Sequence, residues 1–263
     1  MEWSCHLHGV DMRTSTISFV VALLVIGAAQ VPPIAELHAQ APSTSRGVRG
    51  DSAALTAVQL MLNHLGGREL WAKARSLHVR ERAYSAALKQ EMQAEFWRDV
   101  REPRIWYRQV SPETERTVAI TGEHGWQLRD GKLTEHSAAE IQRWTTLWPR
   151  LLYTMFYRLA AGDSTITVRL EEPRTLLVLD GAGVELCRFF LNAAGEMIRW
   201  RVDDREDHLY GPLRSFGQVR MPDWGASTDA RYRFYYTAFE ISPDPPPISF
   251  ARPSSSGTAR SPR

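Results

Sequence analysis

Apolar and polar residues alternate along two stretches of this chain, at about 76–128 and 165–239. Between them, residues 137–162 carry apolar side chains three and four positions apart. A period of two is typical of strands that bury one face, whereas spacings of three and four are typical of helices. The pattern therefore predicts two blocks of strands separated by one helical segment.

The strand signals and the turns between them indicate an antiparallel sheet. In the first block we expect strands at 76–88, 91–100, 104–110, 115–121 and 124–129. In the second block we expect them at 164–170, 174–180, 184–191, 196–203, 207–216 and 229–240. Asp130-Gly131 is a dipeptide typical of a tight hairpin turn. About eleven strands exceed what a flat open sheet carries, so we expect the sheet to curve into a partial barrel.

The helical segment has clear start, break and stop signals. Ser137 and Glu140 have the spacing of a capping box, in which each side chain bonds a free amide of the first turn. Pro149 lacks an amide hydrogen, so two short helices are expected to meet there. Gly162 is expected to end the second helix.

One face of this helical segment is predicted to be the ligand-binding surface or part of a core. Spacings of four place four apolar residues along that face, namely Trp144, Trp148, Leu152 and Phe156. The strand residues expected to face them are Phe96, Trp106, Trp126, Phe189, Trp200 and Phe234. The inward register is defined by alternation only near 198–202, where Ile198, Trp200 and Val202 share one side. Two interpretations fit this pattern: a lid over an apolar cavity, or an ordinary α+β core.

The N-terminal residues predict export. Residues 17–29 form an uncharged apolar run of 13 residues, shorter than the roughly 20 that span a bilayer. Arg13 precedes the run, and small residues near Ala39 and Ala41 offer a cleavage site. We therefore expect residues 1–41 to be a secretory signal peptide, with a short membrane anchor as the alternative interpretation.

The start of the chain and its cysteines bear on the same prediction. Met12 is an alternative start, because residues 1–11 add two acidic residues where such signals prefer positive charge. No cysteine follows the apolar run, so a lipid-anchored signal is not expected. Removal of residues 1–41 leaves Cys187 alone, so no intramolecular disulfide can form. Cys187 is expected to be a small buried apolar side chain in a soluble mature protein.

The remaining chain is predicted to form one domain. Residues 42–51 have the composition of a linker, and residues 254–263 have that of a disordered tail. Residues 52–253 between them are expected to form the domain. The domain begins with an amphipathic helix at 52–65, which Gly66 and Gly67 end.

Composition and motifs give no support for catalysis or nucleic-acid binding. The formal net charge of +2 comes without a basic block, so no nucleic-acid partner is expected. The chain contains no nucleophile elbow, phosphate loop or dinucleotide fingerprint. Its histidines lack metal-ligand spacing, so we expect no metal, no cofactor and no catalytic residue. An exported hydrolase would need catalytic groups dispersed along the chain.

Several short motifs follow one another in order through most of the domain. They are residues 65–67 (LGG) with Trp71 and 76–77 (SL), then 103–106 (PRIW), 122–126 (GEHGW), 217–222 (GQVRMP) and 250–253 (FARP). Through these motifs, over about 53–253, the chain resembles the outer-membrane lipoprotein-sorting family, the LolA/LolB-type periplasmic carriers.

The resemblance implies an α+β fold, in which a curved antiparallel sheet forms an incomplete β-barrel with an N-terminal helix and a mid-chain helical lid. It implies a non-catalytic periplasmic carrier or binder that holds a lipid or a lipoprotein acyl chain in an apolar cavity. A membrane-associated donor or acceptor protein is a further partner that it implies.

The chain departs from the family in its arginine-rich tail and in having no clear counterpart of a lipoprotein-holding residue. The cargo is therefore open between a lipoprotein and another lipid. The alternative is a periplasmic protein-interaction or sensor module with the same fold and a filled core.

Overall fold

The computed structural model of this protein describes residues 47–172, 174–203 and 207–253. The predicted signal peptide, residues 42–46 of the predicted linker and the predicted tail lie outside the described residues. The helices are α1 (Ser52–His64), α2 (Arg68–Lys73), α3 (Ala138–Leu147), the 3-10 helix η1 (Trp148–Arg150) and α4 (Leu152–Ala161). None of the helices in the described ranges is both long and apolar enough to cross a membrane.

Most of the strands fall into the two predicted blocks. Those before the helical segment are β1 (Arg49–Gly50), β2 (Ser76–Ser85), β3 (Gln90–Asp99), β4 (Arg104–Val110), β5 (Glu115–Ile120), β6 (Gly125–Arg129) and β7 (Lys132–Glu135). Those after it are β8 (Thr167–Glu171), β9 (Thr175–Leu179), β10 (Glu185–Leu191), β11 (Met197–Arg201), β12 (Asp207–Tyr210), β13 (Leu213–Phe216), β14 (Val219–Pro222), β15 (Trp224–Ser227) and β16 (Tyr232–Ser242). Strands β1 and β7 lie outside the predicted blocks.

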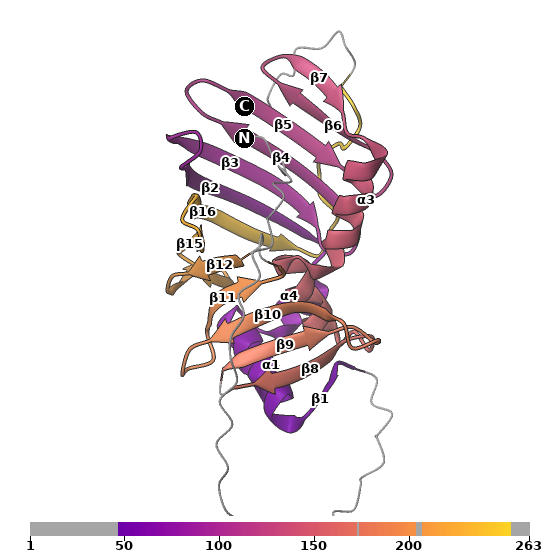
Figure 1. The fold of residues 1–263 in the computed structure, drawn as a ribbon, viewed down its shortest axis with the longest axis vertical. Helices are drawn as coiled ribbons and strands as arrows, with labels where there is room; N and C mark the ends of the chain where they lie inside the picture. The colour runs from indigo at the N-terminus through magenta and orange to yellow at the C-terminus, as the bar shows by residue number, and fades with distance from the viewer. Residues whose placement is uncertain (1–46, 173, 204–206, 254–263) are drawn as a thin grey trace, which may run out of the picture. The chain divides into compact units, whose positions relative to one another are not determined.

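Fourteen of the described strands form one curved sheet, in the order β1-β8-β9-β10-β11-β12-β15-β16-β2-β3-β4-β5-β6-β7 (Figure 1). Strands β1 and β8 pair in parallel, and every other pairing in this sheet is antiparallel. The sheet ends at β1 and β7, which do not pair with one another in the described part of the chain. The predicted fold class, an α+β protein with an incomplete antiparallel barrel, is confirmed.

The local signals form the turns and caps that they predict. The Ser137 side chain accepts from the Glu140 amide, and the Glu140 carboxylate accepts from the Ser137 amide at 2.7 Å. Pro149 lies in η1, which separates α3 from α4, and Gly162 ends α4 in the left-handed conformation. Asp130 and Gly131 both have positive φ, as a two-residue hairpin between β6 and β7 requires.

Six short strands differ from the prediction. Arg49 and Gly50, placed in the linker by composition, pair with Thr167 and Val168 as β1. Strands β7, β14 and β15 were not expected, and the region predicted as one strand at 207–216 divides into β12 and β13. Each of these strands has at most four residues. Such a length is too short to show an alternation that a sequence pattern detects.

The expected register of β11 is wrong at one position. Ile198 was predicted to share the inward side of Trp200, but its side chain is 42% exposed. The pairing of β10 with β11 shifts between Phe190 and Leu191, so Met197 lies opposite Leu191 and is buried instead. A bulge of this kind inserts a residue and breaks the alternation that the prediction assumed.

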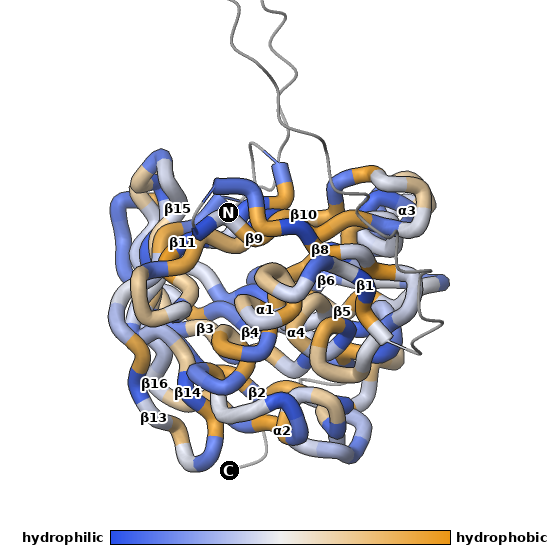
Figure 2. The backbone as a smooth tube through the Cα atoms, turned by 90° about the horizontal axis from the view of Figure 1, so that it is seen from below, coloured by the Kyte–Doolittle hydropathy of each residue, from blue (hydrophilic) through white to orange (hydrophobic). Residues whose placement is uncertain are grey.

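The helices pack on one side of the curved sheet, which we call the inner face. In the end-on view of Figure 2, α1 and α4 lie in the middle and the strands surround them. On α1 the buried residues are Ala54, Ala57, Val58, Met61 and Leu62. Burial of these apolar side chains between helix and sheet, at about 25 cal/mol per Å² of apolar surface, holds the helices on the inner face.

Candidate functional site

Strand pairing shows which side chains of β2–β5 belong to the inner face. Phe96 on β3 lies opposite Val79 on β2 and Tyr107 on β4. Tyr153 on α4 lies 6.3 Å from Phe96 and 5.5 Å from Phe239 on β16, measured between ring centroids. Directly opposite residues of neighbouring strands point to the same side. Phe96 is therefore on the inner face beneath α4, as predicted.

Trp106 and Trp126 were predicted for the same face, and the structure places them on the other one. Trp106 lies opposite Trp97 on β3 and Ala119 on β5, and Ala119 lies opposite Trp126 on β6. Trp97 is the neighbour of Phe96 in sequence, so this row of indoles points away from the helices. The prediction failed because apolar residues occupy adjacent positions in these strands, and alternation could not select the side.

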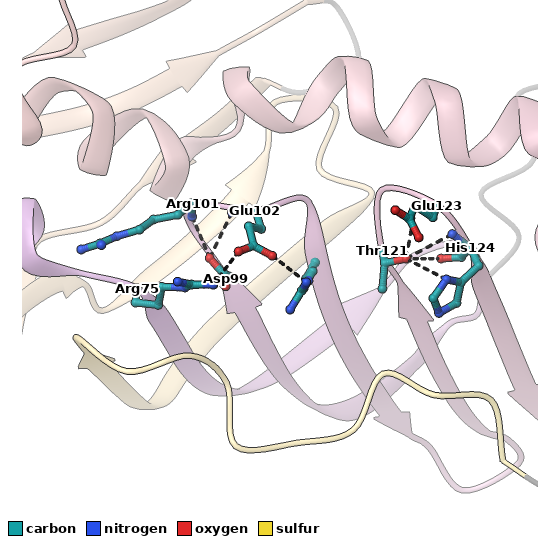
Figure 3. A network of polar contacts seen from close by, with 8 residues as sticks. Arg75, Asp99, Arg101, Glu102, Thr121, Glu123 and His124 are labelled. Carbon is teal, nitrogen blue, oxygen red and sulfur yellow. Dashed lines mark hydrogen bonds and ion pairs between the residues drawn. The ribbon is translucent and has the colours of Figure 1, made fainter.

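The C-terminal segment covers part of this outer row. The Trp126 Nε1–H donates to the Phe250 carbonyl at 3.0 Å, and Arg252 forms an ion pair with Glu135 at 2.6 Å. Figure 3 shows the yellow C-terminal segment running across the strands on the side opposite the helices. This contact explains why Trp126 is only 5% exposed although it lies on the outer face.

Helix α4 is the centre of a filled aromatic core. Phe156 is fully buried and lies 5.0 Å from Trp71 on α2 and 5.7 Å from Phe189 on β10, between ring centroids. Trp200 lies opposite Phe189 and is buried on the same side of the sheet. Seven residues of α4 are buried, including Leu152. Phe156, Phe189 and Trp200 thus form one packed cluster, and Leu152 is buried on the same helix as Phe156.

Helix α3 packs far less deeply than α4. Ile141 is its one buried residue, whereas Trp144 is half-buried. A side chain at Gly125 on β6 would come within 2.9 Å of the Ile141 Cδ1 atom, so the glycine allows α3 to approach the sheet closely. The predicted helical lid therefore has two unequal parts. Helix α4 is core. The segment α3–η1 is a cover, in which α3 buries Ile141 and η1 is tied to the sheet by hydrogen bonds from Arg150 to the Leu186 and Val202 carbonyls.

Arg98 connects this cover to the sheet. Its side chain lies on the inner face of β3, two positions after Phe96. The guanidinium carbon lies 5.9 Å from the Trp144 ring, 5.5 Å from the Trp148 ring and 5.3 Å from the Tyr153 ring, and the Phe96 ring is 5.8 Å away. A cation at these distances from aromatic faces gains about 0.5–2 kcal/mol. The sequence analysis missed Arg98 because a charged residue in a strand is assigned by default to the solvated face.

Two indole N–H groups of the cover are buried without an acceptor. The Nε1 atoms of Trp144 and Trp148 have no hydrogen-bond partner among the described residues. The two indole rings lie 5.5 Å apart between centroids. A buried donor left without a partner costs about 1–3 kcal/mol, and native proteins contain few of them.

A second polar cluster lies farther along the inner face. Glu81 on β2 is 7% exposed and accepts a hydrogen bond from the Tyr232 hydroxyl at 2.6 Å. Burial raises the pKa of Glu81 to about 7, and the positive charge of Arg98 opposes this shift. Near it, the hydroxyls of Tyr153 and Tyr236 are hydrogen-bonded at 2.5 Å. At neutral pH the Glu81 carboxyl is thus divided between its neutral and charged forms.

Phe234, the last predicted site residue, is also on the inner face. It lies opposite Ala83 on β2, and its ring contacts Tyr236 at 5.1 Å and Tyr210 at 6.5 Å. Phe234 therefore belongs to the aromatic group near Glu81 and not to the area beneath α3. The structure brings Trp144 and Trp148 together with Phe96, and it brings Leu152 and Phe156 together with Phe189 and Trp200.

A polar network fixes the turn between β3 and β4 beside these helices (Figure 3). Asp99 is fully buried and accepts from the Arg75 side chain at 2.9 Å and from the Arg101 and Glu102 amides at 2.8 and 3.1 Å. The Arg101 guanidinium lies 5.3 Å from the Tyr157 ring on α4. Asp99 and its partners thus anchor one end of the inner face and of α4.

A cleft of about 370 Å³ lies away from the helical cover. It is lined by residues of β11, β12, β15 and the connection between them, among them Ile198, Tyr210, Leu213 and Trp224. Trp224 is 36% exposed, and its indole lies against Gly211, where a side chain would clash with it. Apolar side chains are thus accessible on this part of the surface.

Metal-ligating side chains do not cluster in the described ranges. No group of three histidine, cysteine or acidic side chains there could hold a metal ion. Cys187 is fully buried opposite Val178, and burial raises the pKa of its thiol. The predicted burial of Cys187 is confirmed, and a buried thiol with a raised pKa is a poor nucleophile.

No protein-family model and no curated protein matches the chain. Among solved structures, it is similar to a DUF1329 family protein from Desulfovibrio piger, with 6% identity and a TM-score of 0.39, over 73% of this chain and 94% of that one. It is also similar to LprF from Mycobacterium bovis, with 10% identity and a TM-score of 0.29, over 78% and 98% of the two chains. A chain of the Pseudomonas aeruginosa MucA/MucB complex matches with 13% identity and a TM-score of 0.21, over 76% and 62%. At these TM-scores the similarities carry no argument about function.

Proposed function

We propose that this protein is an exported, non-catalytic binder of an acyl chain, which it holds on the inner face of its open sheet beneath α3–η1. The observation that carries the proposal is the unequal packing of the two helices. Helix α3 buries one residue and α4 buries seven. A segment that covers an apolar surface with few contacts can leave it at a smaller free-energy cost than a core helix can.

The surface beneath α3 has the chemistry of an acyl site. Arg98 on β3 lies opposite Ile105 on β4, Ile105 lies opposite Ile120 on β5, and Ile120 lies opposite Gly125 on β6. Gly125 contacts the cover at Ile141. Ile105 and Ile120 therefore lie side by side on the sheet under α3, and an acyl chain laid across them would bury its methylenes at about 0.8 kcal/mol each.

Opening of the cover is the conformational step in this proposal. The segment α3–η1 is joined to α4 at Leu151, whose backbone is extended and not helical. Rotation at Leu151 would lift α3–η1 while α4 stays in the core around Phe156. Trp144 and Trp148 would then contact the acyl chain when the cover closes over it.

The test measures acyl binding to the mature chain and to a matched pair of variants. Ile120 and Thr117 are both half-buried residues of β5, but Ile120 faces the cover and Thr117 faces the outer side. We expect the parent protein to bind a fluorescent acyl chain and Ile120→Glu to lower its affinity by about tenfold or more, since a carboxylate there would be buried against the ligand. Thr117→Glu should leave the affinity unchanged. A parent protein that binds no acyl chain, or two variants with equal affinities, would contradict the proposal.

The second candidate is a protein-interaction module with a filled core. The packed cluster around Phe156 and the accessible apolar cleft at Trp224 favour it. In this case a photo-crosslinking residue at position 224 should capture one defined partner in cells, and Trp224→Ala should abolish complex formation with that purified partner. The acyl-binding measurement above would then give no signal for the parent protein.

A further inference from the structure

Hydrogen-bond donors collect where the cover meets the sheet. The indole N–H groups of Trp144 and Trp148 are buried and have no acceptor among the residues that the structure describes. Trp148 as a whole is 5% exposed. Both rings lie within 5.9 Å of the Arg98 guanidinium carbon, so a cation and two vacant donors share one small volume.

Glu81, on the same face of the sheet, already accepts a hydrogen bond from the Tyr232 hydroxyl. The two indole N–H groups are therefore buried donors without an acceptor in the described part of the chain, and they lie beside a guanidinium. An arrangement with excess donors is complementary to an oxygen anion, because carboxylate and phosphate oxygens accept several hydrogen bonds and pair well with a guanidinium.

We propose that Arg98, Trp144 and Trp148 form a head-group subsite that takes an anionic oxygen group, a carboxylate or a phosphate, at the end of the bound acyl chain. The inference rests on the acyl site proposed above and adds the chemistry and the direction of the ligand. The head group lies at Arg98 on β3, and the tail crosses Ile105 and Ile120 toward Gly125 on β6. Three strand spacings of roughly 4.8 Å give this path a length of about 14 Å.

Ligands that share one tail and differ in their head group test this subsite directly on the mature protein. Dodecanoate, dodecyl phosphate, methyl dodecanoate and dodecylamine have the same tail and differ at the head. We expect the two anions to displace a neutral fluorescent acyl probe at about tenfold lower concentration than the methyl ester, and the amine to be weaker than the ester. Acetate and inorganic phosphate, which have the head group without the tail, should not displace the probe at the same concentrations.

Substitutions that remove one indole N–H and keep an aromatic ring test whether these donors cause the preference for anionic head groups. Trp144→Phe and Trp148→Phe should each reduce the anion-to-ester ratio by about fivefold while the ester binds as before. Arg98→Gln should remove the preference. Trp97→Phe is the matched control, because Trp97 is adjacent to Arg98 on the opposite face of β3. It should keep the parent ratio. Thermal melting of each variant identifies any that fails to fold, and the four-ligand comparison on the parent protein does not depend on them.

The outcomes separate this inference from the acyl site itself. Equal binding of anions and ester by the parent protein would overturn the head-group subsite and leave the acyl site standing. A preference for anions that both Trp→Phe variants retain would overturn the assignment to these donors. Displacement by acetate or phosphate alone would indicate a free-anion site and overturn the acylated ligand. Failure of every ligand to bind would overturn both proposals.

Discussion

Phe156 and Trp144 lie on the two halves of the helical segment. From their burial, we expect Phe156 to contribute more than Trp144 to the free energy of unfolding. Phe156 is fully buried on α4, with the Trp71 and Phe189 rings at 5.0 and 5.7 Å. Trp144 is half-buried on α3, where its ring faces Arg98 at 5.9 Å. Truncation of each residue to alanine therefore tests whether α4 is core and α3 is cover.

The expected magnitudes follow from these contacts. Phe156→Ala removes a buried ring and leaves a cavity, which costs about 3–5 kcal/mol in a packed core. Trp144→Ala removes one cation–π contact and a partly exposed ring, which we expect to cost about 1–2 kcal/mol. For a domain of this size each kcal/mol lowers Tm by about 2–4 °C, so Phe156→Ala should lower Tm by about 6–20 °C and Trp144→Ala by about 2–8 °C.

Thermal and urea unfolding of the mature protein, followed by far-UV circular dichroism, measures both losses without relying on tryptophan fluorescence. Hydrogen exchange adds a local measurement, in which α3 amides should exchange faster than α4 amides. Equal losses of stability for the two variants, or equal protection of the two helices, would show that α3 is core. The cover on which both proposals depend would then not exist.

Three further predictions concern stability outside the cover. Trp126→Phe keeps an aromatic ring and removes the hydrogen bond to the Phe250 carbonyl. Urea unfolding should show a loss of about 0.5–1.5 kcal/mol, and proteolysis should cut the C-terminal segment sooner. Asp99→Ala leaves the Arg75 guanidinium and two amides without their buried acceptor, so urea unfolding should show a loss of about 3 kcal/mol, whereas a loss below 1 kcal/mol would contradict the anchoring role. The pKa of Glu81 is raised from 4.5 to about 7 by burial, so the folded state holds a proton that the unfolded state releases between these values. Stability should therefore fall by about 3 kcal/mol as the pH rises from 4.5 to 7, and Glu81→Gln should remove that part of the pH dependence.

The extent to which the candidate site was predictable differs between its two sides. On the helical side, the spacing predicted that Trp144, Trp148, Leu152 and Phe156 share one face. The helices lie where the spacing placed them, but the structure divides the four residues between the cover and the core. The strand side was predictable only in part. Phe96 lies on the inner face, but Trp106 and Trp126 lie on the outer one.

The position of Arg98 was not predictable from the sequence, for a different reason. The pattern of polar and apolar residues assigns a strand arginine to solvent, whereas in the structure Arg98 lies on the inner face with four aromatic rings around it. Three of those rings come from positions at least 46 residues later in the chain. A contact over such a separation leaves no local pattern.

The sequence by itself determined the elements whose causes are local. Ser137 and Glu140 cap α3, Gly162 ends α4 and Asp130-Gly131 turns β6 into β7, because each depends on the conformations and hydrogen bonds of neighbouring residues. Only the tertiary structure decided which side of β3–β6 meets the helices. In a strand, a shift of one residue exchanges the two faces. Phe96 and Trp97 are adjacent and both apolar, so either of them could occupy the buried inner face. That choice depends on the burial of the whole sheet against α4 and on the C-terminal segment over Trp126, which no local pattern encodes.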